Sequence, residues 1–295
     1  MSLSSLIKLF ALAAIWGSSF LFMRIAAPVL GPVMLITLRV LLGSLFLLAV
    51  SRVNGSRLDI RRDWKHFLIL GLANTALPFT LFAFAAETLP ASLLSILNAT
   101  APIWGAIVSA IWLRTAFTLK AMAGLLFGIA GVAILVGIDG AHMTAATLIA
   151  VVAGLAAGLC YGIASVYAKQ AKSVEPFANA HGSLWAAVLW MAPAAPFFPP
   201  VAMPGLWVVV SVVAVGVMCS GIAYMLYFKL IEEIGAAQTL SVGFLIPVFG
   251  VLWGALFLHE AVTARTIIGG LVVLIGMALI TGFNPLALMR RRAAA

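Results

Sequence analysis

The sequence predicts an all-α integral membrane protein with ten transmembrane helices, arranged as two inverted five-helix repeats around a central cavity. Three observations support this fold class. The 295 residues are 64% hydrophobic and only 8% charged, whereas soluble domains carry about 25% charged residues. The chain contains ten apolar runs, each of about 20 residues, which is the length a helix needs to cross a bilayer. Matching residues also recur at a constant offset of 145 positions.

The composition also restricts the classes of function. The net charge of +9 would suit a nucleic-acid partner, but the basic residues lie in short loops between apolar runs, which is typical of a membrane protein. We therefore expect a lipid bilayer and no nucleic acid as partner. Cys160 and Cys219 lie inside apolar runs and are predicted to be small core residues. The sequence has no P-loop, no cluster of metal ligands and no catalytic set, so we expect no cofactor, no metal site and no enzyme activity.

The ten predicted spans are separated by loops that hold most of the charged and turn-forming residues. The first run continues to Met23, so we interpret it as a retained span and not as a cleaved signal peptide. The spans lie near residues 4–23, 32–51, 65–85, 91–113, 118–137, 145–168, 177–198, 205–228, 236–258 and 263–283.

The offset of 145 positions relates five spans to the next five without a gap, which indicates an internal duplication. It places the repeats at residues 1–145 and 146–295. Matching pairs include Trp16 and Tyr161, Arg24 and Lys169, Gly71 and Gly216, Phe79 and Tyr224, Glu87 and Glu232, Pro102 and Pro247, Gly105 and Gly250, and Thr118 and Thr263.

Because five is an odd number, the second repeat must enter the membrane with the opposite orientation to the first. The distribution of Lys and Arg agrees with this topology. Fourteen of them lie at the two termini and in the loops after spans 2, 4, 6 and 8, whereas the other loops hold only Arg24 and Arg265. Basic residues stay on the cytoplasmic side. We therefore expect both termini to be cytoplasmic, in a multi-pass protein of a bacterial-type inner membrane.

Prolines are expected to break three of the spans. Proline has no N–H, so the carbonyl four residues earlier loses its helical partner. Pro102 would free the carbonyl of Asn98 and Pro247 that of Gly243, while Pro78 acts in the same way in span 3. Free carbonyls at membrane depth are tolerated where they face protein or a water-filled cavity. We interpret these breaks as the lining of a cavity that receives an ammonium group; the alternative is a kink that only shapes packing.

Aromatic and small neutral side chains near these breaks are the candidate substrate-binding residues. Aromatic faces attract cations and stack on flat apolar groups. The alternative is that these rings face lipid or form an interfacial belt. The candidates are Trp16, Phe79, Phe82, Asn98, Thr100, Trp104, Tyr161, Tyr224, Ser241, Gly243 and Phe244.

Ionisable residues inside spans are functional candidates because their burial in a membrane is costly. We predict that Arg39 forms a structural ion pair with Glu87 or snorkels towards the membrane surface; a role of Arg39 as a carboxylate clamp is the alternative. His181 is expected to be a packed neutral histidine, with proton coupling as its alternative. Glycines at 124, 128, 154, 158 and 162 predict close helix packing, and a homodimer contact through span 5 or 10 is the alternative there.

Several segments resemble the drug/metabolite transporter superfamily, in its ten-span branch with two EamA-type repeats. They are "AAIWGSSFLFMRIA" in span 1, Arg39 in span 2, "APIWGAIVSAIWL" in span 4 and "IPVFGVLWGALFLHEAVTARTIIGGLVVLIGMALI" across spans 9 and 10. The chain is similar to bacterial aromatic amino-acid exporters of this superfamily. The resemblance implies a basket-like cavity lined by spans 1, 3, 4, 6, 8 and 9. The first half departs from the pattern, because Thr115 stands where the second half has Glu260.

These observations together predict a secondary transporter that exports neutral or aromatic amino acids and related small metabolites by alternating access. Inverted repeats are an architecture of secondary transporters, with the substrate site at the repeat interface. Two alternatives remain open. The chain could export other small metabolites or drugs with the same fold, or it could be a membrane receptor or scaffold that transports nothing.

Overall fold

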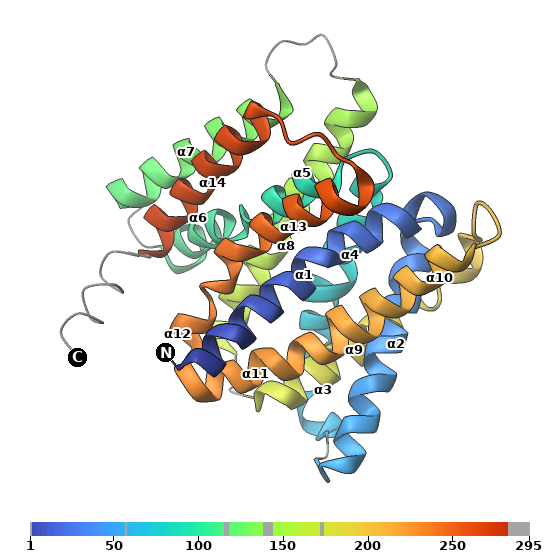
Figure 1. The fold of residues 1–295 in the computed structure, drawn as a ribbon. Coiled ribbons are helices and arrows are strands. Elements are labelled where there is room, and N and C mark those ends of the chain that lie inside the picture. The colour runs from blue at the N-terminus through green and yellow to red at the C-terminus, as the bar shows by residue number, and fades with distance from the viewer. Residues whose placement is uncertain (1, 57, 115–117, 138–143, 172–173, 283–295) are drawn as a thin grey trace.

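The computed structural model describes residues 2–56, 58–114, 118–137, 144–171 and 174–282, and its regular elements in these ranges are all helical. Their arrangement is shown in Figure 1. The α-helices of the first half are α1 (Leu3–Leu30), α2 (Pro32–Val53), α3 (Ile60–Leu70), α4 (Leu77–Ala86), α5 (Ala91–Asn98), α6 (Ala101–Leu113) and α7 (Leu119–Val136). Those of the second half are α8 (Ala145–Gln170), α9 (Pro176–Met191), α10 (Leu206–Val213), α11 (Ala223–Ile234), α12 (Ala236–Thr239), α13 (Val242–Leu258) and α14 (Ala264–Thr281). Two π-helical segments, η1 (Gly71–Ala76) and η3 (Ala214–Ile222), and a 3₁₀ turn, η2 (Ala195–Phe197), complete the described elements.

Eight helical stretches in the described residues are long and apolar enough to cross a membrane, two fewer than the sequence predicts. The predicted span near 236–258 is divided into α12 and the 17-residue apolar helix α13. The predicted span near 177–198 ends early, because α9 has 16 residues and the chain then turns at Ala192. Both segments are helical, but each is shorter than the about 20 residues that span a bilayer core.

Helices α7 and α14 have corresponding places in the two halves and pack side by side (Figure 1). A Cβ on Gly124 would lie 2.7 Å from the carbonyl oxygen of Gly276, and a Cβ on Gly269 would lie 2.9 Å from that of Gly131. Each contact becomes the other when the halves are exchanged at the 145-residue offset. Small residues permit such close approach of helix backbones, so these glycines set the distance between the two helices.

The same exchange relates the contacts between the first and fourth segments of the two halves. Helix α1 packs on α13, and α8 packs on α6. A Cβ on Gly17 would lie 3.0 Å from the backbone nitrogen of Gly250, and one on Gly162 would lie 2.8 Å from that of Gly105. The first helix of each half thus packs against the other half, as a twofold relation between two repeats requires.

Local irregularities of the backbone repeat as well. The π-helical segments η1 and η3 overlap at the 145-residue offset. Helices α6 and α13 both end at a residue with positive φ, which is 52° at Arg114 and 53° at His259. A non-glycine residue in this region is uncommon, so its occurrence at two equivalent positions indicates the same helix ending in both halves.

The predicted breaks at Pro102 and Pro247 do not repeat. In the first half α5 ends at Asn98, and Pro102 stands in the first turn of α6, where its missing N–H costs nothing. In the second half the chain turns at Leu240 and Ser241, and α13 runs through Pro247. The expected break beside Gly243 is therefore displaced towards the N-terminus. Neighbouring helices can accommodate a proline within a membrane helix.

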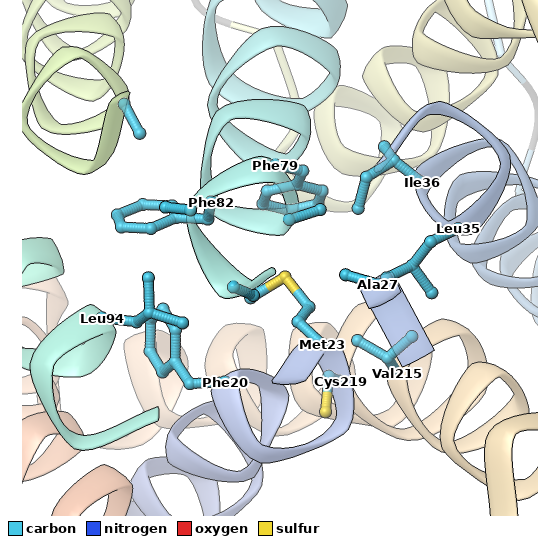
Figure 2. Packing of buried hydrophobic residues seen from close by; sticks show 14 of the residues in the cluster. Phe20, Met23, Ala27, Leu35, Ile36, Phe79, Phe82, Leu94, Val215 and Cys219 are labelled. Atoms are coloured by element: carbon cyan, nitrogen blue, oxygen red, sulfur yellow. The ribbon is translucent and has the colours of Figure 1, made fainter. Parts of the chain in front are cut away.

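The core lies where α1, α2, α4, α5 and η3 meet (Figure 2). Phe20 and Met23 from α1 face Phe79 and Phe82 from α4, and all four side chains are at most 8% exposed. Cys219 reaches the same core from η3. Packed side chains occupy this region, and two hollows among the described residues lie at the two ends of α1.

Candidate functional site

Aromatic rings from both halves meet around Trp16 in the middle of α1. Its indole contacts Tyr224 edge-on at a centroid distance of 6.3 Å and Tyr227 at 5.4 Å. Tyr224 also stacks on Phe228 at 6.0 Å. The indole N–H of Trp16 donates to the carbonyl of Cys219 at 3.2 Å. This bond fixes the ring orientation and satisfies a polar group that would otherwise be buried unpaired.

A second group of rings lies beside the first. Phe82 contacts Phe20 edge-on at 5.6 Å and stacks on Tyr161 at 6.3 Å. Trp16 and Phe20 share one face of α1, because residues four apart are neighbours on a helix, and this face carries a ring of each group. The two groups form what we call the central aromatic cluster: Trp16, Phe20, Phe82, Tyr161, Tyr224, Tyr227 and Phe228.

Arg39 of α2 adjoins this cluster. Its guanidinium carbon lies 3.7 Å from the ring centroid of Phe79, at the distance of a cation–π contact. Its Nε donates to Ser220 Oγ at 3.0 Å and its Nη1 to Ser19 Oγ at 3.1 Å. A further contact joins Nη1 to the sulfur of Met23 at 3.7 Å. Arg39 is 4% exposed, so a full positive charge is held in the core by neutral groups.

The expected ion pair between Arg39 and Glu87 does not form. Arg39 points into the core, whereas Glu87 caps the C-terminus of α4 and lines a hollow at the surface. Arg24 instead contacts the C-terminus of α4, where its Nη1 donates to the carbonyls of Ala86 and Glu87 at 2.8 Å each. Partial burial raises the pKa of the Glu87 carboxyl. The predicted ion pair was wrong because the rotation of α2 about its axis directs Arg39 towards α1 and η3. The positions of the spans in the sequence do not reveal this rotation.

Asn98, Thr100 and Trp104 lie apart from the cluster, where α5 and α6 pack on α8. The Thr100 hydroxyl donates to the carbonyl of Leu97 at 2.7 Å. A Cβ on Gly158 would lie 2.9 Å from Cδ1 of Trp104 and 3.1 Å from Oγ1 of Thr100. Thr100 and Trp104 are thus close-packing contacts of α8, and Asn98 is the last residue of α5.

Ser241, Gly243 and Phe244 also lie outside the cluster, around the turn between α12 and α13. The Ser241 hydroxyl donates to the carbonyl of Gln238 at 2.7 Å. A Cβ on Gly243 would lie 2.9 Å from Cε of Met277 in α14, and Phe244 packs on the same small core. Of the predicted binding residues, the structure therefore brings together Trp16, Phe79, Phe82, Tyr161 and Tyr224, and places the helix-break residues elsewhere.

Pro78 opens α4 immediately after the π-helical segment η1. Its equivalent in the second half is Ala223, which opens α11 directly after η3. The change from π-helix to α-helix occurs at both positions, with proline in one half and alanine in the other. Proline alone therefore does not determine where this change occurs. π-Bulges inside helices are frequent at functional sites, and both of these lead into helices that carry rings of the cluster.

Sequence reasoning did not select several residues of this region. Phe20 could have been found from its four-residue spacing to Trp16, and Phe228 from the same spacing to Tyr224. Ser19 and Ser220 gave no such signal, because serines recur throughout membrane spans. Only the tertiary structure shows that both hydroxyls contact Arg39.

The two ends of α1 are held by different contacts. Near its N-terminus, Lys8 and Ser5 both bind the carboxylate of Glu233 on α11. Near its C-terminus, Arg24 faces a hollow that is also lined by Glu260. The carboxylate of Glu260 accepts the N–H groups of the first residues of α5, Ala91 at 2.6 Å and Ser92 at 3.0 Å, which places a negative charge at a helix N-terminus. Thr115, its equivalent in the first half, lies outside the described residues.

His181 of α9 is 2% exposed, and Trp185 lies one turn along the same helix. The indole N–H of Trp185 donates to His181 Nε2 at 3.0 Å. An indole N–H can only donate, so Nε2 is the acceptor and the ring hydrogen lies on Nδ1. This arrangement requires a neutral imidazole, whose Nδ1 finds no partner among the described residues.

Comparison with known families matches two segments of the chain, residues 3–137 and 148–282, to the EamA-like transporter family. The two matched segments begin 145 positions apart. The chain belongs to the EamA-like transporter family. This membership identifies a multi-pass membrane transporter that acts on small molecules. Each half of the chain matches the family model once.

Relatives of this EamA-like transporter cover most of its length. It is 24% identical to the uncharacterized transporter YvbV of Bacillus subtilis, over 91% of this chain and 88% of the relative. It is 23% identical to YoaV of the same organism, also an uncharacterized transporter, over 92% and 94% of the two chains. A solved structure described only as a crystal structure of a protein is similar with a TM-score of 0.66 and 20% identity, over 94% of this chain and 98% of that one.

Proposed function

We propose that this EamA-like transporter exports neutral and aromatic amino acids and related small metabolites. The observation that carries the proposal is the central aromatic cluster, in which rings of α1 and α4 meet rings of α8 and α11. Secondary transporters with inverted repeats hold their substrates at the repeat interface. A planar apolar side chain stacks well on such rings, and an ammonium group is attracted to their faces.

The proposed mechanism is alternating access between two inverted five-helix repeats, with ten spans in a bacterial-type inner membrane and both termini cytoplasmic. The links at the two ends of α1 support it. Contacts of Lys8 with Glu233 would close the cytoplasmic side, and contacts of Arg24 with the end of α4 would close the outer side. Because the two sets share no residue, one can open while the other stays closed.

Counterflow in proteoliposomes tests the proposed function directly. Vesicles loaded with unlabelled phenylalanine should accumulate labelled phenylalanine when they contain the protein, and protein-free vesicles should not. Trp16→Ala, Tyr161→Ala and Tyr224→Ala should each reduce the accumulation, because each removes a ring of the cluster. Trp207→Ala is the matched control, since Trp207 is 75% exposed on α10.

Unchanged transport in all three cluster variants would contradict the assignment of the site. Absence of phenylalanine uptake by correctly folded protein would exclude this substrate, and a panel of other metabolites and drugs would then test the same fold with another cargo. A receptor or scaffold would exchange none of them.

A further inference from the structure

Arg39 carries a positive charge into the core without an acidic partner. All of the hydrogen-bond acceptors that it contacts are neutral, namely two serine hydroxyls and a thioether sulfur. In the described part of the chain, ion pairs join Lys8 to Glu233 and Arg62 to Asp63, and neither involves Arg39. A buried ion without a counterion is costly, and in membrane proteins such residues mark substrate or ion pathways.

No acidic side chain of the described residues forms an ion pair with Arg39. Each lies in a loop or within about a turn of a helix end, some 5 Å along the axis. The described acidic residues are Asp59, Asp63, Glu87, Glu175, Glu232, Glu233 and Glu260. Among the described residues, Arg39 therefore has neutral partners and no carboxylate counterion.

The fold itself does not require a charge at this position. The equivalent residue of the second half is Leu184 of α9, which is 1% exposed in an apolar setting. A Cβ on Gly43 would lie 3.6 Å from Cδ1 of Leu184, so leucine fills the corresponding space by ordinary packing. The same helix arrangement thus forms with leucine at one of the two equivalent positions and arginine at the other. Packing alone therefore does not account for the arginine.

The guanidinium retains donors that the protein does not use. An arginine has five N–H groups. Nε is bonded to Ser220, and Nη1 is bonded to Ser19 and Met23, while Nη2 has no acceptor among the described residues. The hydroxyl of Ser220 donates to the carbonyl of Val215 at 3.1 Å, which leaves its lone pairs for Arg39 and holds Nε in place.

The surroundings of these donors match an aromatic carboxylate. Phe79 covers one face of the guanidinium at 3.7 Å. The rings of the central aromatic cluster adjoin Phe79, because Phe82 lies about one turn along the same helix. A carboxylate bound at Nη2 would form charge-assisted hydrogen bonds, and the ring attached to it would then lie against the rings of the cluster.

We propose that Arg39 is the carboxylate-binding residue of the transport site, and that the substrates are solutes with a carboxylate group next to an aromatic or apolar group. This inference rests on the proposed function, and it restricts the related metabolites named there to solutes that bear a carboxylate. Aromatic amines without a carboxylate are excluded as substrates, because they would add a second positive charge beside Arg39.

Ligand-induced thermal stabilisation of the purified full-length protein tests the proposal without any transport. A ligand that binds the native state raises its Tm, and the stabilisation grows with the logarithm of the ratio of ligand concentration to Kd. The probes are phenylalanine, 3-phenylpropionate, which lacks the ammonium group, and phenylalaninamide, which lacks the carboxylate. The wild type should be stabilised by the first two and not by the third. Stabilisation by phenylalaninamide alone, or by none of the three, would overturn the proposal.

Substitutions in α2 test whether this ligand-induced stabilisation depends on Arg39. Arg39→Met should weaken binding of both carboxylates at least tenfold, and Arg39→Lys should restore part of it because it keeps the charge. Arg52→Met is the matched control on the same helix, since Arg52 is exposed near its C-terminus, and it should bind like the wild type. If Arg39→Met does not fold, the comparison of Arg39→Lys with Arg52→Met and the selectivity of the wild type still decide the question.

Counterflow separates this proposal from the proposed function. Carboxylate binding that depends on Arg39 but is not accompanied by exchange would refute transport of these solutes and leave the binding site intact. Exchange of phenylalanine that is unchanged in Arg39→Met would support the transport function and refute the role of Arg39.

Discussion

Arg39 and Leu184 stand at equivalent positions of the two halves and have opposite chemistry. Leu184 fills its site by apolar packing. Arg39 is held by the hydroxyls of Ser19 and Ser220; the equivalent of Ser19 is Ala164, and that of Ser220 is Thr75. By contrast, the glycine contacts that join the halves repeat closely. The glycine contacts of this transporter are therefore symmetric, whereas the charge of Arg39 has no equivalent in the second half.

The two ends of the core differ in the same way. Arg24 donates to the carbonyls at the end of α4, whereas its equivalent, Lys169, is exposed at the end of α8. Glu87 lines a hollow beside Arg24, and its equivalent, Glu232, is exposed on α11. Equivalent charged positions of the two repeats therefore take part in different contacts.

The largest expected effect on stability comes from substitutions that exchange the side chains at positions 39 and 184. Leu184→Arg places an unpaired charge in an apolar site and should destabilise the protein by about 3 kcal/mol, the scale of cost for a charge at the centre of a membrane helix. Arg39→Leu should change stability far less, because replacing a buried charge by an apolar group is often neutral. Thermal unfolding with size-exclusion chromatography measures both. Equal losses in the two variants would contradict the asymmetry.

Substitutions at equivalent glycines of the two halves should reduce stability by equal amounts. Gly71→Ser and Gly216→Ser each add a Cβ that would lie 2.7 Å from an atom of the facing helix, the Ser183 carbonyl oxygen and the Leu42 Cβ respectively. Overpacking of this kind costs about 1–3 kcal/mol. Gly205→Ser is the control, since no atom lies within 4 Å of its added Cβ and serine suits a helix N-cap. A large loss in only one of the two contact variants would show that the scaffold is not symmetric.

The contacts of Glu260 with the N-terminus of α5 should contribute a smaller amount to the free energy of unfolding. Glu260→Gln keeps one acceptor but loses the charge that faces the N–H groups of Ala91 and Ser92. The expected loss is about 1 kcal/mol, as for other helix caps, and it should appear as a lower Tm. Glu232→Gln, at an exposed position of α11, provides the control. An unchanged Tm in Glu260→Gln would show that water replaces the carboxylate without cost.

The smallest effect concerns pH. Partial burial raises the pKa of Glu87 in the folded state, so the folded protein binds this proton more tightly than the unfolded chain does. Stability contributed by the neutral carboxyl is then present below the unfolded value, about 4.3, and decreases as pH rises through the folded pKa. Arg24 and Glu260 line the same hollow. Relative to wild type, Glu87→Gln should lose less Tm as pH rises through this range, and parallel pH profiles would contradict the expectation.

Much of the fold could be predicted because membranes impose simple rules on sequence. Apolar runs and the constant offset predicted helices and a duplication, and the paired glycines meet across the halves as such an offset requires. The positions of the helix ends were harder to predict. Pro102 stands at a break and Pro247 does not, because neighbouring helices decide whether a proline interrupts a membrane helix.

The candidate site was predicted in part for a related reason. Trp16, Phe82, Tyr161 and Tyr224 converge, and their aromatic character at mid-span was visible in the sequence. Asn98, Thr100, Trp104 and the residues near Ser241 do not join them, because the helices rotate those positions towards α8 and α14. Sequence spacing gives the face of a helix but not the neighbour that this face meets.

The sequence by itself determined that this protein is a membrane-embedded, duplicated, helical chain of the EamA-like family, since hydropathy and an internal repeat are properties of residue order. Only the tertiary structure decided that Arg39 contacts hydroxyls and an aromatic ring and not Glu87. The rotation of each helix about its axis depends on packing with several others at once. A charge in the core therefore acquires its partners only when all of these helices are in place.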